Sequence, residues 1–354
     1  MSRFFSEKYK DLNPYVPGEQ PRDRRYIKLN TNESPFPPSP KAVEYAAAAA
    51  RNLQLYSDPT CTSIKEKMAQ LKGVKKEQLF FGNGSDEVLY CAFLAFCDNN
   101  VGAIFPDISY GFYKVFAQFT GIPHTQVPLE EDFSIAVEPY CGAGKTVFIA
   151  NPNAPTGKLL SIMQIETILK ANPDNVVVID EAYIDFGGES AIRLIDSYDN
   201  LLVTQTFSKS RSLAGGRLGM AFGNEKLIQD LLTVKYSINP YNVNSMTMAA
   251  GLGALEDEEY TQKNCKTVAQ NRAFTTENLR KLNFTVLDSS ANFAMAAHPD
   301  IPGGTLYQKL KDKGILVRYF GTERLAPYVR ITIGSREQME SLLQAVTEIL
   351  EERP

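Results

Sequence analysis

The feature of this 354-residue chain that indicates its chemistry most directly is a lysine placed between groups that can bind phosphate. Lys209 lies in the segment 206–210, directly after Ser208, and Arg217 follows a short glycine-rich stretch. A lysine amine can form a Schiff base with an aldehyde, while a hydroxyl and a guanidinium can hold a phosphate. These three residues therefore predict an anchor for pyridoxal phosphate, a cofactor with both groups. A solvated loop rich in Ser, Lys and Arg is the alternative for this stretch alone.

A second candidate is a pair of carboxylates at the end of an apolar run. The run 176–179 ends in Asp180 and Glu181, and Tyr183 follows. Such a run predicts a buried parallel strand whose carboxyl end faces a ligand. Because a buried aspartate favours a protonated pyridine ring, Asp180 is the candidate partner of the ring nitrogen, and Tyr183 could bond the ring hydroxyl. Alternatively, the carboxylates open a helix and favour the positive end of its dipole.

Two turns follow other strand-like runs. The turn 151–157, after the apolar run 146–150, contains two prolines and a glycine and is expected to be rigid. The turn that contains Gly84 and Ser85 leads into a helical pattern, and free backbone amides at a helix start can hold a phosphate. Ser85 could equally be an ordinary N-cap residue.

Together, in this order, the four motifs resemble those of fold type I pyridoxal phosphate enzymes, the aspartate aminotransferase superfamily. Within it the chain is most similar to the histidinol-phosphate aminotransferases, through the segments 12–15, 28–35, 212–215, 240–244 and 329–334. The resemblance implies an α/β fold, with a large domain built on a mainly parallel sheet and a smaller α+β domain. It also implies transamination between L-histidinol phosphate and 2-oxoglutarate, which yields imidazole acetol phosphate and L-glutamate in histidine biosynthesis.

The resemblance implies a role for each matching residue. Lys209 would form the Schiff base and shuttle the proton, with Asp180 and Tyr183 as its catalytic partners. Tyr110 would stack on the pyridine face, although an aromatic at that spacing is otherwise core packing. Gly84, Ser85, Ser208 and Arg217 would hold the phosphate. The predicted cofactor-binding set is Tyr56, Gly84, Ser85, Asp86, Tyr110, Asn153, Asp180, Tyr183, Ser208, Lys209 and Arg217.

Two positions carry further implications of the resemblance. Tyr56 matches a tyrosine that in this family reaches the cofactor phosphate of the partner subunit, which implies a homodimer. At position 154, many relatives have an asparagine that bonds the ring hydroxyl, whereas this chain has Ala154. Asn153 could substitute for it. Since Tyr183 would still reach the same oxygen, the change is expected to alter Schiff base basicity rather than abolish catalysis.

Substrate binding is expected to depend on two arginines near the C-terminus. Arg318 and Arg330 lie in strand-like runs, where an arginine is costly unless it is paired, so an internal salt bridge is the alternative for each. The resemblance makes Arg330 the residue that grips the anionic group of the substrate. It implies a substrate-binding set of Tyr15, Asn32, Tyr241, Asn242, Arg318 and Arg330.

Alternating strand and helix signals predict how these residues are positioned. Strands are expected over 78–81, 101–105, 146–150, 176–179 and 201–205, in a mainly parallel sheet covered on both faces. The later pattern predicts a long helix over 256–281, strands over 285–287, 293–296, 315–318 and 328–333, and a closing helix over 336–352. We therefore expect an N-terminal segment 1–29 that packs with the small domain, a large domain 30–255 that binds the cofactor, and a small domain 256–354.

Composition agrees with a soluble enzyme. The net charge of −4, with no long basic run, gives no reason to expect nucleic-acid binding. No apolar run has membrane-spanning length and no secretory signal is visible, so a cytoplasmic protein without a membrane partner is expected. Five cysteines without a CxxC pair and two histidines outside any motif predict neither a metal site nor a disulfide framework.

Other functions are compatible with the same motifs. An aromatic amino acid aminotransferase and a threonine-phosphate decarboxylase have the same fold and very similar sequences. A protein that only senses pyridoxal phosphate is a rival from another class. It is disfavoured because the chain has no room for a winged-helix extension before the segment 28–35.

Overall fold

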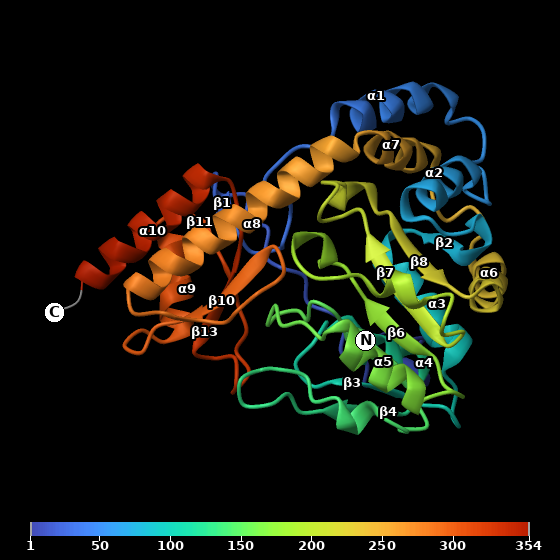
Figure 1. Ribbon diagram of the computed structural model, residues 1–354. Helices are drawn as coiled ribbons and strands as arrows, with labels where there is room; N and C mark the ends of the chain where they lie inside the picture. The colour runs from blue at the N-terminus through green and yellow to red at the C-terminus, as the bar shows by residue number, and fades with distance from the viewer. Residues whose placement is uncertain (1, 353–354) are drawn as a thin grey trace.

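The computed structural model describes residues 2–352, which form a large and a small lobe joined by a long helix (Figure 1). The large lobe contains a seven-stranded sheet in the order β2-β8-β7-β6-β5-β3-β4. β8 runs antiparallel to both of its neighbours, and the other strands run parallel to one another. The predicted mainly parallel sheet is therefore confirmed. The strands are β2 (Leu79–Gly82), β3 (Ala103–Pro106), β4 (His124–Val127), β5 (Thr146–Ala150), β6 (Val177–Asp180), β7 (Leu201–Thr206) and β8 (Gly219–Gly223).

The central strands bury side chains on both faces, as parallel strands covered by helices do. In β5, Val147 and Ile149 belong to one core, whereas Phe148 belongs to the core on the opposite face. The first core is closed by α2 (Thr62–Lys72), α5 (Ile162–Ala171) and α7 (Ser245–Glu256), and α1 (Pro40–Ala49) packs on α7. The second is closed by α3 (Gly84–Phe96), α4 (Phe112–Thr120) and α6 (Glu225–Ile238).

Two strands of the large sheet were not predicted from the sequence. β4 reads His-Thr-Gln-Val and lies at the edge of the sheet, where only Val127 is buried. β8 is buried throughout but begins and ends with glycine, a residue that weakens strand propensity. β4 has no continuous apolar run, and the short apolar run of β8 lies between two glycines, so pairing with β3, or with β2 and β7, makes each segment a strand.

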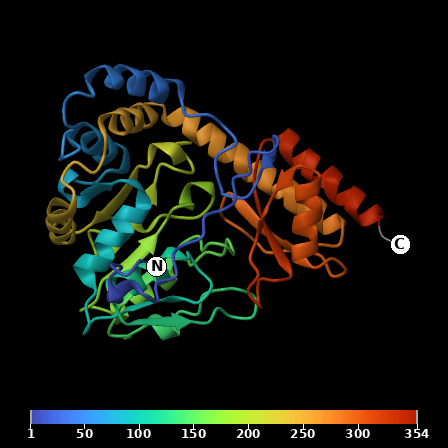
Figure 2. The same cartoon turned by 180° about the vertical axis from the view of Figure 1, so that it is seen from behind.

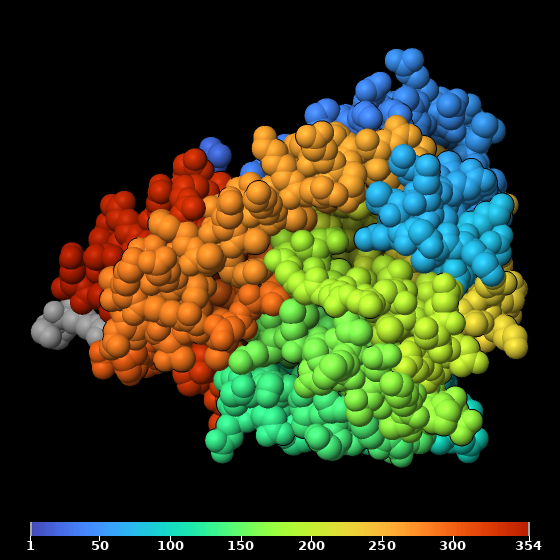
Figure 3. Space-filling view, in the orientation of Figure 1, coloured from blue at the N-terminus to red at the C-terminus, as the bar shows by residue number. Residues whose placement is uncertain are grey.

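The long helix α8 (Glu258–Lys281) crosses from the large lobe to the small lobe (Figures 1 and 3). It corresponds to the predicted helix 256–281 but begins two residues later. Asp257 leaves the helical backbone conformation, with φ −114° and ψ 48°, and so separates α8 from α7. The bend lets α7 pack along the large sheet while α8 continues into the other lobe.

The small lobe is built on a four-stranded sheet in the order β12-β13-β10-β9. The predicted strand 315–318 divides in two, because β11 (Ile315–Leu316) pairs with the N-terminal strand β1 (Ile27–Lys28), whereas β12 (Arg318–Tyr319) pairs with β13. Leu29 packs into the core of this lobe. The remaining elements are β9 (Thr285–Val286), β10 (Phe293–Ala297), β13 (Tyr328–Thr332), α9 (Gly303–Asp312) and α10 (Arg336–Glu351).

The N-terminal segment connects the two lobes (Figure 2). Tyr9 and Tyr15 stack on Phe119 and Phe112 of α4, with ring centroids 5.1 and 4.4 Å apart. Further along, β1 joins the small lobe. No helix within residues 2–352 is both long and apolar enough to cross a membrane.

Candidate active site

Two adjoining cavities lie at the carboxyl ends of β6 and β7. The first has a volume of about 370 Å³ and is lined by Ser85, Asp86, Asp180, Ser208 and Arg217, among others. The second has a volume of about 640 Å³ and lies toward the small lobe. The residues that line both are Thr31, Tyr110, Ala154, Tyr183 and Lys209. A molecule that fills the first cavity can therefore contact one that fills the second.

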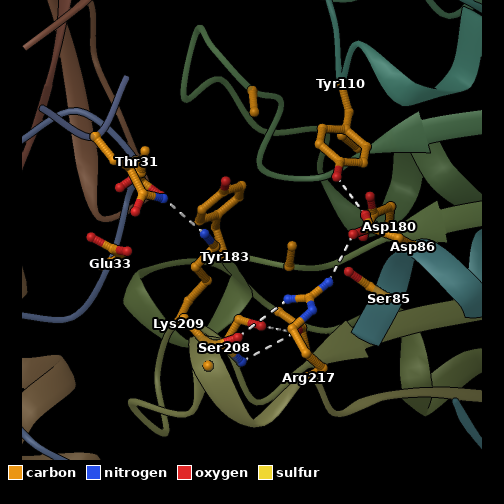
Figure 4. Close-up of a pocket in the computed structure, with 17 residues that line it drawn as sticks. Thr31, Glu33, Ser85, Asp86, Tyr110, Asp180, Tyr183, Ser208, Lys209 and Arg217 are labelled. Atoms are coloured by element: carbon orange, nitrogen blue, oxygen red, sulfur yellow. Dashed lines mark hydrogen bonds and ion pairs between the residues drawn. The ribbon is translucent and has the colours of Figure 1, made fainter. Parts of the chain in front are cut away.

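Lys209 lines both cavities, and Figure 4 shows it among the side chains of the first. It follows β7 by three positions, and its Nζ donates a hydrogen bond of 3.3 Å to the carbonyl of Thr31. The same nitrogen lies 5.7 Å from the ring centroid of Tyr183. Within the turn, the backbone N–H of Ser208 donates to the hydroxyl of Thr206 at 3.1 Å, which holds the turn in place. The amine is thus presented to the cavities by a turn with its own hydrogen bonds.

Asp180 is the last residue of β6 and is buried at the opposite wall of the first cavity. The hydroxyls of Tyr113 and Thr204 donate to its two carboxylate oxygens at 3.0 and 3.1 Å. Burial raises the pKa of Asp180 to about 6, and these two hydrogen bonds oppose that rise. A cation in the cavity would favour the charged carboxylate further, as a protonated ring nitrogen does.

The start of α3 and the loop before β8 together form a cradle for an anion. Asn83, the N-cap residue of α3, makes no side-chain cap hydrogen bond, so its side chain does not occupy the amides of the first helical turn, and its own amide donates to the Glu87 carboxylate at 2.5 Å. Such amides attract anions. Arg217 lies beside this helix end, and its Nη2 contacts the Asp86 carboxylate at 2.8 Å. A side chain at Gly219 would collide with the backbone of Gly84 and Ser85, so glycine is needed where β8 approaches the cradle.

Two tyrosines form further parts of the first cavity. Tyr110 donates a hydrogen bond of 2.5 Å to Asp86, and burial raises the pKa of Tyr110 well above its usual value. The hydroxyl of Tyr183 accepts a hydrogen bond of 3.0 Å from the side-chain amide of Asn32. The cavity therefore has an amine, a buried carboxylate, a phenol ring and an anion cradle. This set fits an aldehyde cofactor with a pyridine ring and a phosphate.

The second cavity is lined by three arginines, of which Arg318 and Arg330 are the two predicted to bind substrate. Within residues 2–352 neither Arg318 nor Arg330 forms an ion pair, so the internal salt bridge considered as an alternative is not formed. Arg330 donates to the carbonyl of Asn30 at 3.0 Å, and its Nε is buried without a hydrogen-bond partner among the described residues. Burial lowers the pKa of Arg330. A buried guanidinium of this kind favours an anionic ligand, which would supply the missing partner.

The aromatic and polar surroundings of the arginines come from three parts of the chain. The Arg330 guanidinium lies over the rings of Phe293 and Phe320, at 5.2 and 5.4 Å from their centroids. Arg318 reaches back to the carbonyls of Val16 and Pro17 at 3.4 and 3.5 Å. The other predicted substrate residues that line this cavity are Tyr15 and Asn32.

Five predicted site residues lie outside the walls of both cavities, and one of them, Gly84, is the first residue of α3. Asn153 is fully buried, where its side chain accepts from Ser109 at 2.8 Å and donates to the carbonyl of Ile108 at 3.0 Å. Its side-chain amide is thus occupied by the segment 108–109, and Ala154 lines the cavities instead. The others are Asn242, buried against Glu87, and Tyr56 and Tyr241, which stack on each other at 4.6 Å on the surface.

The structure also places residues at the site that the motifs did not single out. Glu33 lines the first cavity and forms an ion pair with Lys28 at 2.7 Å. Arg324 lines the second cavity and donates to the carbonyls of Leu129 and Glu130 at 2.9 and 2.6 Å. Glu33 lies within the segment 28–35, which was singled out for the resemblance it carries. No local pattern marked Arg324, because its partners are about two hundred residues away.

Fold and site together define a fold type I enzyme of the pyridoxal phosphate class. The chain belongs to the aminotransferase class I and II family, whose sequence model matches residues 24–346.

Similar proteins share the whole length of the chain. A histidinol-phosphate aminotransferase from Brachyspira hyodysenteriae is 47% identical over 353 residues, which cover 99% of each chain. One from Pseudomonas putida is 48% identical and covers 98% of this chain and 100% of its own. Among solved structures, histidinol-phosphate aminotransferase from Sinorhizobium meliloti in complex with pyridoxal-5'-phosphate has a TM-score of 0.89 at 22% identity, with 99% and 98% of the two chains covered. At that identity the likeness shows the fold.

Glu181, next to Asp180, generates a prediction about stability. It lines neither cavity, and its buried carboxylate accepts hydrogen bonds from Ser190, Gln205 and the amide of Ala191. Burial raises the pKa of Glu181 from 4.5 to about 7. Because the folded chain then binds this proton more tightly than the unfolded chain, the stability that Glu181 contributes is lost as pH rises from 4.5 to about 7.

We expect Glu181→Gln to remove this pH dependence. The free energy of unfolding of the variant, relative to the parent chain, should rise with pH by at most about 1.4 kcal/mol per pH unit across that range. Urea unfolding at several pH values measures the difference, with the exposed Glu131→Gln as the control. A difference that stays constant with pH would contradict the assignment.

Proposed function

We propose that this chain transfers an amino group from L-histidinol phosphate to 2-oxoglutarate with pyridoxal phosphate as cofactor. The products would be imidazole acetol phosphate and L-glutamate, as in histidine biosynthesis. The observation that carries the proposal is the position of Lys209, which lines both cavities. On one side lies the anion cradle, and on the other lie Arg318 and Arg330, which have no carboxylate partner among residues 2–352. The relatives that are 47–48% identical over nearly the whole chain support this choice of substrate.

The residues of the first cavity would hold the cofactor. When bound, pyridoxal phosphate supplies an aldehyde that accepts the amino group and a protonated ring that withdraws electrons. Arg217, Ser208 and the amides at the start of α3 would bind the phosphate, because they lie together at one end of the cavity. Asp180 would keep the ring nitrogen protonated, and Tyr110 would cover the ring face. The Tyr183 hydroxyl would bond the ring oxygen and stay oriented by Asn32.

Lys209 would move the proton. Its Nζ lies at the boundary of the cavities and has a weak partner, the Thr31 carbonyl at 3.3 Å. From there it can take a proton from the substrate carbon that carries the amino group and deliver that proton to the cofactor. Closure of the site by Tyr15 and by the small lobe would exclude water from this transfer.

Arg318 and Arg330 would bind the anionic group of each substrate in turn. A phosphate and a carboxylate both offer two oxygens to the planar guanidinium fork, so one pair of arginines can accept histidinol phosphate and 2-oxoglutarate alike. The rings of Phe293 and Phe320 keep Arg330 in place between them. Selectivity for the imidazole would come from the rest of the second cavity.

A homodimer is part of the proposal. Tyr56 is 83% exposed, and other large apolar side chains are exposed near it in the sequence or at the end of α6: Leu53, Leu55, Ile238 and Tyr241. An apolar surface of this kind is typical of an interface between subunits. A partner seated there would place Tyr56 near the cofactor phosphate of the other subunit. The free cysteines, four of five buried, fit a cytoplasmic location.

The substrate profile tests the proposed reaction. Single-turnover absorbance of the bound cofactor should change fastest with L-histidinol phosphate, and more slowly with L-phenylalanine, L-tyrosine and L-threonine phosphate. Lys209→Ala is the inactive control, since it removes the amine that moves the proton. Lys170→Ala, an exposed lysine on α5, should behave like the parent chain. Preference for an aromatic amino acid would agree with an aminotransferase but would refute L-histidinol phosphate as its substrate. Release of carbon dioxide from L-threonine phosphate would indicate a decarboxylase.

Arg330→Met tests the anion site. The variant keeps an apolar stem between the two phenylalanine rings but loses the charge. We expect the KM for L-histidinol phosphate to rise about 10- to 100-fold, the range for loss of one charge-assisted contact. The affinity for pyridoxal phosphate should remain unchanged, and Arg193→Met on the surface should change neither quantity. A larger loss of cofactor affinity than of substrate affinity would remove Arg330 from the substrate site.

Sedimentation equilibrium tests the dimer. The parent chain should have twice its mass of 39.4 kDa. The double variant Leu55→Asp and Ile238→Asp should shift to monomer and bind pyridoxal phosphate more weakly, because charges are costly in an apolar interface. Met163→Asp, at an even more exposed apolar position on α5, is the control and should stay dimeric. A parent chain that sediments as a monomer would refute the dimer without touching the proposed reaction.

A further inference from the structure

Tyr113 is a buried tyrosine of α4 that lines neither cavity but contacts two residues that do. Its side chain is 1% exposed, and its hydroxyl donates to one oxygen of Asp180 at 3.0 Å. Its ring meets the ring of Tyr110 edge to face, with centroids 5.7 Å apart and an interplanar angle of 85°. One side chain thus touches both the carboxylate and the phenol that would face the cofactor ring.

The contact with Asp180 is directional. Thr204 of β7 donates to the second oxygen of the same carboxylate, so a different donor is assigned to each oxygen. With both oxygens held, rotation of the carboxylate is restricted, and the lone pairs that remain point along defined directions. Burial also raises the pKa of Tyr113 well above its usual value, so its hydroxyl stays a neutral donor.

The contact with Tyr110 extends to the anion cradle. Tyr110 donates to Asp86 at 2.5 Å, and Asp86 pairs with Arg217 at 2.8 Å (Figure 4). A continuous set of contacts therefore runs from Arg217 through Asp86 and Tyr110 to Tyr113, and from there to Asp180. These contacts connect the residues proposed to bind the cofactor phosphate with Asp180, the residue proposed to bind the ring nitrogen. Tyr113 is the residue that contacts both Tyr110 and Asp180.

We propose that Tyr113 is a positioning residue for the cofactor. Its hydroxyl orients Asp180 toward the ring nitrogen, and its ring sets the position of Tyr110 against the ring face. The inference rests on the proposed function, because it assigns the ring to the first cavity. Tyr113 itself touches neither cofactor nor substrate.

Packing alone is the competing explanation, and the chain offers a matched residue to separate the two. The ring of Tyr113 packs in an aromatic cluster with Phe105 and Phe148. Tyr140 is equally buried in the large lobe, at 0% exposure, yet its hydroxyl has no hydrogen-bond partner among the described residues. If only the buried ring matters, removal of either hydroxyl should have the same effect on cofactor binding.

The experiment compares Tyr113→Phe with Tyr140→Phe in the full-length chain. Pyridoxal phosphate is titrated into each cofactor-depleted protein between pH 5.5 and pH 8, which is about the range over which Asp180 changes charge. The affinity for pyridoxal phosphate is read from the absorbance of the bound cofactor. We expect Tyr113→Phe to weaken the affinity about tenfold, the loss for one hydrogen bond to a charged group, and more strongly at the acid end. Tyr140→Phe should match the parent chain at every pH.

Two further variants complete the test. Thr204→Val removes the other donor and should weaken the affinity in the same pH-dependent way, so it replaces Tyr113→Phe if that variant does not fold. In an Asp180→Asn background, Tyr113→Phe should add little, because the charge it orients is gone. In the loaded enzyme, kcat should fall while the KM for L-histidinol phosphate stays constant.

The outcomes separate the two proposals. Equal affinities for Tyr113→Phe and Tyr140→Phe, or full additivity of Tyr113→Phe with Asp180→Asn, would overturn the role of Tyr113. A parent chain that binds pyridoxal phosphate but does not turn over L-histidinol phosphate would refute the proposed function, while the affinity comparison would still decide the role of Tyr113.

Discussion

The paired register of β5, β6 and β7 is the constraint on which the rest of the site depends. Asp180 lies opposite Ala150 of β5 and Thr204 of β7, so the parallel ladder sets the depth of the carboxylate in the lobe and supplies one of its hydrogen-bond donors. The turn that presents Lys209 continues from β7 at the same edge. A slip of one residue would point Asp180 to the opposite face of the sheet. The position of the amine relative to the carboxylate therefore depends on backbone hydrogen bonds in the middle of the sheet.

Around this edge, the protein keeps buried charges of opposite sign apart. Within the part of the chain that the structure describes, Asp180 has hydroxyl donors but no cation beside it, and Arg330 has a carbonyl and two aromatic rings but no carboxylate. Burial raises the pKa of Asp180 and lowers the pKa of Arg330. For both residues, burial therefore disfavours the charged form. Such an arrangement costs stability, and ligands of complementary charge would offset the cost. Under the proposed function, the second cavity would select anions, because Arg318 and Arg330 have no carboxylate partner among the described residues.

The two lobes contribute different parts of this arrangement. The large lobe supplies the amine, the carboxylate and the anion cradle, while β12 and β13 of the small lobe carry the arginines. The N-terminal segment joins them, since Tyr15 stacks on α4 and Asn32 contacts both Tyr183 and Thr332. Fold alone does not define the substrate, because one fold hosts many functions. Under the proposed function, side chains around the second cavity would make that distinction.

The sequence alone determined the apolar runs that become β5, β6 and β7 and the polar residues directly after them, because strand length and turn chemistry are local properties. The family resemblance added roles for Lys209, Asp180 and Arg330. Only the tertiary structure decided that Asn153 bonds Ser109 and Ile108, that Arg330 has no carboxylate partner among the described residues, and that Tyr113 bonds Asp180. The reason is separation along the chain: Tyr113 and Asp180 are 67 residues apart, and Arg330 and Asn30 are 300 apart. Contacts over such distances follow from how the strands and lobes pack, which no local pattern records.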